Sequence, residues 1–381
     1  MRMLFICSAK SSAYRKSYPH RIVQLERHCR KLGADASLLF LGDLFFASPT
    51  LIQPLSFPFV LRQIREFDVI HAGGSGGAYF VAAIKSFLRQ GTLVVYDVHG
   101  DAIAESRLQA KGLLDLVGHF NAFQMRFAEY FGVKSADCFI TATSRLKQRL
   151  LARNNNIEGD NVEVILNGVN IDSFKPLKDK IAHENKFTVT YAGSFYKYQG
   201  INNLIQAAEN LTREDILFKF IGFRSGDSKI KEQIRDKLGK KALLLDWLPK
   251  TDLQEELQKS DVLIIPADAS TREQAENRVL AFPTKFAEFL ALAKPVIVTR
   301  IDETSKIVER FDCGFVCEPT AESIAETIRK AKETPQKTLV LKGLNGRRFA
   351  EAELDINLIC KKYLKFLSRI LEKRSSRNRY I

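Results

Sequence analysis

Residues 261–300 read DVLIIPADASTREQAENRVLAFPTKFAEFLALAKPVIVTR, and this stretch decides the fold. The β-branched apolar runs at 262–265 and 295–299 predict two strands that are buried on both faces, as in a parallel sheet. Between them, apolar side chains recur at helical spacing, namely Phe286, Phe289, Leu290 and Ala293. Strand, helix and strand therefore form one βαβ unit, which predicts an α/β fold.

The start of the predicted helix carries polar side chains. Pro283 suits the first helical turn, because its missing N–H needs no partner there. Thr284, Lys285 and, one turn on, Glu288 follow at the carboxyl edge of the sheet, where open α/β sheets bind ligands. The helix amides and the Lys285 charge suit phosphate, and the Glu288 carboxylate suits ribose hydroxyls. A capped crossover helix without a ligand is the alternative.

The run Pro-Thr-Lys-x-x-Glu-x-x-x-x-x-Lys-Pro-Val-Ile, which starts at Pro283, resembles the nucleotide-sugar site of family 4 glycosyltransferases. The resemblance covers most of the chain and is strongest at residues 136–297. Because these are retaining enzymes of GT-B fold, it implies two doubly wound Rossmann-like domains facing a central cleft. It also implies that Glu288 binds the donor ribose and that residues 283–286 lie beside the diphosphate.

Length and composition indicate a globular protein of two domains. A chain of 381 residues exceeds one ordinary core, and its 45% hydrophobic and 27% charged residues are typical of soluble proteins. No apolar run reaches membrane-spanning length, and the start of the chain is interpreted as a first strand. The six scattered cysteines indicate reduced thiols and a cytoplasmic location. Cys313-x-x-x-Cys317 lacks the second ligand pair of a zinc site, so we expect no metal there.

Alternating strands and helices predict a doubly wound parallel sheet in each half of the chain. Besides the two strands named above, strands are predicted at residues 4–7, 37–41, 68–71, 93–98, 137–141, 162–166, 187–192, 216–221, 242–245 and 314–317.

The domain boundary is predicted from a signature and a polar stretch. Asn167-Gly168-Val169-Asn170, followed by Phe174-Lys175-Pro176, resembles the family signature that precedes the interdomain linker, and residues 178–186 suit that linker. We therefore predict an acceptor-side domain at 1–176 and a nucleotide-sugar-binding domain at 187–345. By the resemblance, a helix in the remaining segment, 346–381, crosses back to the first domain.

A glycine loop follows the strand at 187–192 and is the second predicted part of the donor site. Gly193 and Gly200 allow backbone amides to face a diphosphate, and Lys197 adds a positive charge. The family has an arginine where Ser194 stands and a lysine where Gln199 stands. Arg224, after the next strand, is a candidate replacement for the arginine, and a tight turn without a ligand is the alternative.

The family also has a second glutamate eight residues before Glu288, where this chain has Leu280. In the family this glutamate contacts the sugar hydroxyls, so the resemblance implies that this chain lacks the usual contact. Candidate replacements in the preceding loop are Glu276, Asn277 and Arg278, and a mixed-charge surface loop is the alternative.

Four residues are predicted on the acceptor side of the site. His99 follows the strand at 93–98 and matches a family histidine that lines the cleft, where it could donate to an oxyanion or an acceptor hydroxyl. Asp101 and Glu105 come next along the chain. Arg21 resembles a recurring arginine on the acceptor side of the family. Purely structural roles remain open for His99 and Arg21.

A competing interpretation comes from Gly73-Gly74-Ser75-Gly76-Gly77. With Asp97 downstream, this run is similar to a dinucleotide-binding fingerprint and would make the protein an NAD-dependent enzyme. Tyr79, however, stands where the fingerprint requires a small residue. We therefore interpret the glycines as an acceptor-side loop or a tight turn.

The positive charge of the chain and one aromatic stripe indicate which binding partners to expect. Lysine and arginine number 58 against 44 acids, a net charge of +14, which indicates an anionic partner. The basic segment from Lys361 onward suits anionic lipid or nucleic acid, and lipid-linked family acceptors favour lipid; a packed helix is the alternative. The stripe predicts a core-facing helix, with lipid contact as the alternative; it consists of Phe120, Phe123, Phe127 and Tyr130, with Arg126 and Lys134 near it.

Together these features predict a glycosyltransferase that moves a sugar from a nucleotide diphosphate to a glycan or lipid-linked acceptor of the cell surface. The resemblance implies retention of configuration, no cofactor and no obligatory metal. The predicted catalytic residues are His99, Lys197 and Glu288. We expect no nucleic-acid partner. We expect a cytoplasmic location, and peripheral attachment to the inner face of the plasma membrane remains open. The alternatives are an inactive GT-B binding partner of another transferase and an NAD-dependent enzyme.

Overall fold

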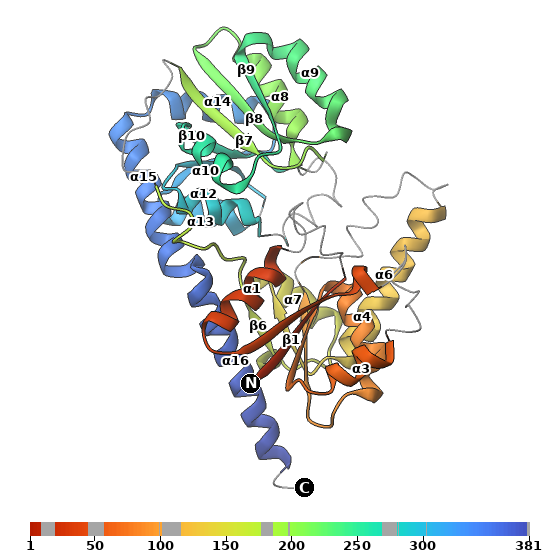
Figure 1. The fold of residues 1–381 in the computed structure, drawn as a ribbon. Helices are drawn as coiled ribbons and strands as arrows, with labels where there is room; N and C mark the ends of the chain where they lie inside the picture. The colour runs from red at the N-terminus through yellow and green to blue at the C-terminus, as the bar shows by residue number, and fades with distance from the viewer. Residues whose placement is uncertain are drawn as a thin grey trace. The chain divides into compact units, whose positions relative to one another are not determined.

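Two compact units make up the chain, shown in Figure 1. Unit 1 comprises Met1–Asn167 and Ile356–Ile381, and unit 2 comprises Gly168–Asp355. The computed structural model describes residues 1–8, 20–44, 57–98, 100, 116–176, 186–196, 199–268, 280, 282–301 and 303–378.

Unit 1 is built on a parallel six-stranded sheet of order β2-β1-β3-β4-β5-β6. Its strands are β1 (Arg2–Cys7), β2 (Asp35–Phe40), β3 (Val69–Gly73), β4 (Leu93–Val98), β5 (Cys138–Thr141) and β6 (Val162–Val164). The central strands β3, β4 and β5 are buried along their whole length, as expected of apolar runs covered on both faces.

The helices of unit 1 cover both faces of this sheet. They are α1 (His20–Lys31), α2 (Leu41–Leu44), α3 (Phe57–Ile64), α4 (Gly74–Ile84), α6 (Leu116–Ser135), α7 (Ser144–Arg153) and α16 (Ile356–Asn378), with short helices η2 (Lys85–Phe87) and η3 (Gly159–Asn161). Side chains of α1 and α16 share one core with β1, β3, β4 and β5. On the opposite face, α4 packs against β1, β3 and β4 and against α6.

The C-terminal helix α16 packs its apolar side into unit 1. Tyr363 and Leu367 are completely buried there, and the Tyr363 hydroxyl lies 2.8 Å from His71 Nδ1 on β3. Several basic residues on the other side pair with acids of the same unit. Lys373 lies 2.7 Å from Glu158, and other pairs are Lys362–Glu163, Arg369–Glu163 and Arg374–Asp137. This is the packed helix that the sequence left open as the alternative to a lipid-binding tail.

Unit 2 contains a second parallel six-stranded sheet, of order β12-β11-β10-β7-β8-β9. Its strands are β7 (Phe187–Ala192), β8 (Ile216–Phe223), β9 (Ala242–Asp246), β10 (Val262–Ile265), β11 (Val296–Thr299) and β12 (Gly314–Cys317). The predicted strands of both sheets are confirmed, with bounds that differ by at most two residues.

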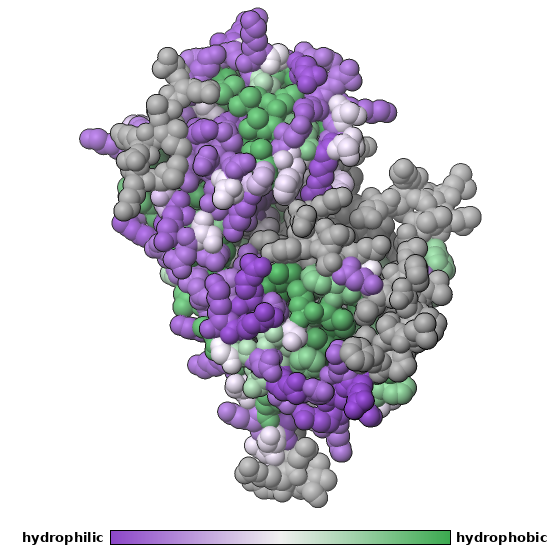
Figure 2. Space-filling view, in the orientation of Figure 1, coloured by the Kyte–Doolittle hydropathy of each residue, from purple (hydrophilic) through white to green (hydrophobic). Residues whose placement is uncertain are grey.

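The helices of unit 2 alternate with its strands. They are α8 (Ile201–Asn210), α9 (Ser228–Leu238), α10 (Lys250–Gln258), α12 (Thr284–Ala291), α13 (Glu303–Phe311), α14 (Ala321–Glu333) and α15 (Gln336–Phe349), with short helices η5 (Ser225–Asp227), η6 (Gly239–Lys241) and η7 (Ala350–Leu354). On the face shown in Figure 2, hydrophilic residues dominate the outside of this unit, and hydrophobic atoms show between them.

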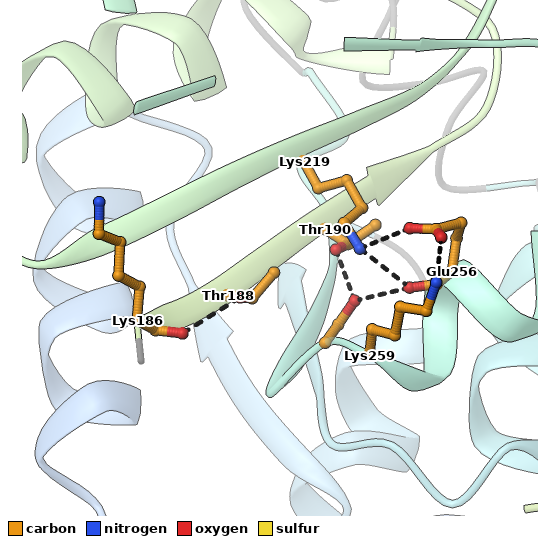
Figure 3. Close-up of polar contacts among 7 residues, drawn as sticks. Lys186, Thr188, Thr190, Lys219, Glu256 and Lys259 are labelled. Atoms are coloured by element: carbon orange, nitrogen blue, oxygen red, sulfur yellow. Dashed lines mark hydrogen bonds and ion pairs between the residues drawn. The ribbon is translucent and has the colours of Figure 1, made fainter. Parts of the chain in front are cut away.

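A buried lysine joins strands β7 and β8 to helix α10 (Figure 3). The Lys219 side chain is 4% exposed, and its Nζ donates to Glu256 Oε2 at 2.8 Å. Lys259 pairs with the same carboxylate, while Thr190 and Ser260 share a hydrogen bond beside it. Burial alone would raise the pKa of Glu256, but hydrogen bonds from the two lysines outweigh burial and lower this pKa. The lysine charge is therefore compensated inside unit 2.

The predicted core position of the α6 aromatic stripe is wrong. Phe120, Phe123, Phe127 and Tyr130 are between 47% and 64% exposed. α6 instead packs its small residues on α4. The two helices are so close there that a Cβ at Gly132 would lie only 2.6 Å from Ala78 Cβ. Small residues let two helices approach closely, so the large rings remain on the outer side. No helix in the described part of the chain is long and apolar enough to span a bilayer.

Candidate functional site

The structure places α12 at the carboxyl edge of the unit 2 sheet, where the strand order reverses. The chain runs from β7 outward through β8 and β9, and then from β10 outward through β11 and β12 on the other side. The connections that follow β7 and β10 therefore lead toward opposite ends of the sheet, and ligands bind α/β sheets at such a point. Pro283 is the N-cap residue of α12, one position before the helical turn in which it was predicted.

The Lys285 side chain lies against the loop that follows β7. Its Nζ is 4.6 Å from the centre of the Tyr191 ring and donates to Gln199 Oε1 at 3.3 Å. A Cβ at Gly193 would lie 2.9 Å from Lys285 Nζ. The missing side chain at Gly193 thus lets the ammonium group approach the loop backbone. Two predicted donor-site residues, far apart in sequence, lie side by side.

Two further glycines bring neighbouring loops to the same place. Gly200 has a φ of 73°, and a Cβ there would lie 1.6 Å from the carbonyl oxygen of Pro266, just after β10. Gly222 has a φ of 118°, and its Cβ would lie 2.5 Å from the carbonyl oxygen of Gly193. Any other residue would separate these backbones. The loops after β7, β8 and β10 therefore converge beside α12.

Ser194 and Arg224 flank this convergence. The Ser194 carbonyl oxygen accepts a hydrogen bond from the Tyr191 hydroxyl. Arg224 is exposed, follows Gly222 by two residues, and its backbone N–H donates to Asp227 at 2.9 Å. Arg224 thus lies on the same edge of the sheet as Lys285. This position is required if Arg224 is to replace the family arginine that is missing at Ser194.

Glu288 stands one turn beyond Lys285 on α12. Burial raises its pKa to about 7, against the opposing effect of Lys250 and Lys285. The carboxyl group thus changes its charge near neutral pH. In the ionised form it accepts hydrogen bonds from hydroxyl groups, and in the protonated form it can donate one.

Sequence reasoning missed Tyr191 and Lys250. Tyr191 was counted as part of a core strand, although a polar-tipped ring two residues before the glycine loop is a signal for a site role. Lys250 begins α10, acts on Glu288 electrostatically and lies 4.4 Å from the centre of the Phe174 ring. Its link to Glu288 depends on the tertiary fold, and the sequence holds no signal for it.

Other predicted residues lie outside the described part of the chain, namely His99, Asp101, Glu105, Lys197, Glu276, Asn277 and Arg278. Leu280 is 4% exposed, so its side chain belongs to the interior of unit 2. Among the residues that the structure describes, no group of three His, Cys, Asp or Glu side chains is arranged to hold a metal ion.

Arg21, predicted on the acceptor side, is 9% exposed and engaged inside unit 1. Its Nε lies 2.8 Å from Asp97 Oδ2, and its Nη1 donates to the Leu166 carbonyl oxygen and to Asn167 Oδ1. Asp97 is completely buried and also lies 3.4 Å from His71 Nε2. Because Arg21 occupies this carboxylate, Asp97 is a poor candidate for the ribose acid of a dinucleotide site.

The glycines after β3 serve close packing within unit 1. A Cβ at Gly73 would lie 1.9 Å from Ile22 Cδ1, and one at Gly76 would lie 2.8 Å from Ser8 Cβ. A Cβ at Gly77 would lie 3.1 Å from the Ile6 carbonyl oxygen. These contacts let β1 and α1 approach the start of α4, which agrees with a tight turn.

Comparisons with known proteins agree with this architecture. The family described as "Glycosyl transferases group 1" matches residues 173–342, and the one described as "Glycosyl transferase 4-like domain" matches residues 15–168. With two parallel Rossmann-like sheets, these matches define the chain as a glycosyltransferase. It belongs to the family 4-like glycosyltransferases of GT-B fold.

Individual relatives are distant. The colanic acid biosynthesis glycosyl transferase WcaI of Escherichia coli is 26% identical over 186 residues, which cover 48% of this chain and 43% of WcaI. The capsular polysaccharide biosynthesis glycosyltransferase CapM of Staphylococcus aureus is 24% identical over 324 residues, 79% of this chain and 76% of CapM. The structure of Anabaena HepE in complex with UDP-glucose has a TM-score of 0.72 at 17% identity, covering 97% of this chain and 100% of HepE.

Proposed function

We propose that this glycosyltransferase takes its sugar from a nucleotide diphosphate donor bound at the carboxyl edge of the unit 2 sheet. The observation that carries the proposal is the convergence of the glycine loop, the Lys285 ammonium group and the start of α12. Backbone amides, a fixed cation and a helix N-terminus are the groups that bind a diphosphate. The HepE complex with UDP-glucose supports a donor of this class.

In the proposed reaction, the bond between the sugar and the diphosphate breaks and the departing diphosphate gains negative charge. Lys285 lies where its ammonium group would stabilise this charge, with Arg224 as a second candidate cation on the same edge. Glu288 would accept hydrogen bonds from the ribose. Retention of configuration, transfer without a cofactor or obligatory metal, and participation of His99 belong to the same proposal, on the strength of the family resemblance. Participation of Lys197 is proposed from its positive charge in the glycine loop.

The acceptor in this proposal is a glycan or lipid-linked glycan of a cell-surface polysaccharide. The names of WcaI and CapM place those relatives in colanic acid and capsular polysaccharide biosynthesis, which supports this class. We also propose a cytoplasmic location, on the ground of the cysteines. Six buried free cysteines are compatible with a reducing compartment.

A thermal-shift panel tests the donor class directly. We expect UDP, GDP or ADP, or one of their sugars, to raise the melting temperature, because a ligand at about 100 times its Kd adds about 2.7 kcal/mol to stability. The panel includes NADH, which we expect to have no effect. Stabilisation by NADH with no response to any nucleoside diphosphate would contradict the proposal and favour a dinucleotide enzyme.

The raised pKa of Glu288 predicts a pH dependence of nucleotide affinity. Because ribose hydroxyls donate to the ionised carboxylate, binding favours deprotonation, and affinity should rise with pH through a pKa of about 7 and level off above it. Between about pH 6 and pH 8, the ionised fraction and hence the affinity should rise about tenfold. Isothermal titration calorimetry with the stabilising nucleotide measures this.

Glu288→Gln is the matched control for the pH experiment. The phosphates of the ligand titrate in the same range, but they do so equally with both proteins. The variant should therefore bind more weakly at high pH and lose the additional tenfold rise. Identical pH profiles for the two proteins would show that Glu288 does not contact the ligand.

A further inference from the structure

The outer side of α6 carries a continuous aromatic surface. We define the aromatic face as Phe120, Phe123, Phe127, Tyr130 and Phe131, whose exposed fractions range from 36% to 64%. Four of the five rings form a connected cluster: the centroid distances are 6.4 Å for Phe123–Phe127, 4.5 Å for Phe127–Phe131 and 5.3 Å for Tyr130–Phe131. Scattered apolar residues are normal on a surface, but a contiguous patch marks an interaction site.

The inner side of α6 packs against α4, and its aromatic face is exposed. Ala128 and Val133 on the inner side are 7% and 8% exposed, and Gly132 allows close packing on α4. Ser75 on α4 also donates to Met125 Sδ at 3.5 Å. In Figure 1, α6 lies along the flank of unit 1 beside α4. The exposure of the rings is therefore a consequence of how the helix packs, which fixes the direction of the aromatic face.

Positive charges lie beside the aromatic face. Lys134 lies at its end, with Nζ 5.0 Å from the centre of the Tyr130 ring, and Arg126 is exposed on the same helix. Helix α7 adds Arg153, whose side chain is 41% exposed. The acid of α6 in this region, Glu129, is 18% exposed and lies 3.8 Å from Arg153. Cations thus dominate the described rim of the aromatic face.

We propose that the aromatic face docks unit 1 onto an anionic membrane surface. Aromatic rings partition into the interfacial layer of a bilayer, and Lys and Arg side chains beside them reach the phosphates of anionic lipids. A chain with a net charge of +14 is attracted to such a surface as a whole. α16 uses much of its positive charge in ion pairs within unit 1. We therefore assign the lipid contact to α6 and not to the C-terminal helix.

Vesicle co-sedimentation of the full chain tests this proposal. We expect the protein to bind vesicles of phosphatidylcholine and phosphatidylglycerol, and to bind pure phosphatidylcholine much more weakly. The double variant Phe123→Ser/Phe127→Ser removes two exposed rings and should lower the partition coefficient at least about tenfold, because the buried apolar area is lost. Unchanged melting temperature and unchanged nucleotide stabilisation show that both units remain folded.

Exposed apolar residues of unit 2 supply the matched control. Val340 and Leu341 on α15 are 48% and 50% exposed, so Val340→Ser/Leu341→Ser removes a comparable surface elsewhere. This variant should bind vesicles like the natural chain. Equal vesicle binding by the Phe123/Phe127 variant, equal loss in the α15 variant, or equal binding to neutral vesicles would each overturn the proposal.

Two further measurements distinguish membrane docking through α6 from self-association and from lipid binding by α16. Light scattering without lipid should show the same oligomeric state for the natural chain and the Phe123/Phe127 variant; dissociation of a dimer by the variant would assign the face to a second copy and overturn the proposal. Lys361→Ser/Lys365→Ser alters two exposed cations of α16. It should leave most vesicle binding intact, and loss of binding in this variant alone would return the lipid contact to the C-terminal helix.

Discussion

Lys285→Ala should lower kcat/KM for sugar transfer about 100- to 1000-fold, which corresponds to about 2.7–4 kcal/mol of lost transition-state stabilisation. The reason is geometric: Lys285 Nζ lies against Gly193, where a diphosphate held by the glycine loop would develop its charge. Much of the loss should appear in kcat, because the charge on the leaving diphosphate grows in the transition state. Steady-state kinetics with the donor identified by the thermal-shift panel measure the effect.

The control for this experiment is Lys306→Ala, which removes the same charge from an exposed position on α13. We expect kcat/KM to stay within about twofold, since an exposed charge is screened by solvent. Circular dichroism should show that both variants are folded. Full activity in Lys285→Ala would remove the central cation from the proposed donor site, and an equal loss in Lys306→Ala would show that net charge alone is responsible.

Asp97→Ala should destabilise unit 1 by about 3–5 kcal/mol, because it leaves the guanidinium group of Arg21 buried without its counter-charge. Domains are stable by only about 5–15 kcal/mol, so this is a large part of the total. The single tryptophan, Trp247, belongs to unit 2 and does not report on unit 1 directly. Hydrogen–deuterium exchange of peptides from β1, β3 and β4 measures the local loss.

Two controls separate the buried charge from a general effect of substitution. The double variant Arg21→Met/Asp97→Leu removes both charges together and should be more stable than Asp97→Ala, since no buried charge remains unpaired. Asp246→Ala breaks an ion pair with Lys231 in which the aspartate is 72% exposed, and it should cost less than about 1 kcal/mol. Equal destabilisation by Asp97→Ala and the double variant would contradict this account.

Local patterns were sufficient to predict the strands of both sheets and the α12 motif. β-branched runs such as 262–265 and 296–299 are buried in any parallel sheet, so their meaning does not depend on distant parts of the chain. Helical spacing likewise located α12 and its polar start at Thr284, Lys285 and Glu288. The order βαβ then implied that these side chains lie at the carboxyl edge of a sheet.

The α6 helix shows where the same reasoning failed. Phe123, Phe127 and Tyr130 recur at the spacing of a buried stripe, and large rings are usually core residues. The competing stripe of small residues around Ala128 and Gly132 has little hydrophobic signal, yet it is the one that packs on α4. Which stripe is buried depends on the shape of the neighbouring helix, and periodicity carries no information about that shape.

The amino-acid sequence was enough to establish the α/β architecture, the strands and the local chemistry at the start of α12, because periodicity and helix-terminal residues act over a few neighbouring positions. Only the tertiary structure could bring Lys285 to Gly193, enclose Arg21 with Asp97, raise the pKa of Glu288 to about 7 and leave the aromatic face of α6 exposed. These features arise from packing between segments that are distant along the chain, and burial and charge at each position are properties of that packing.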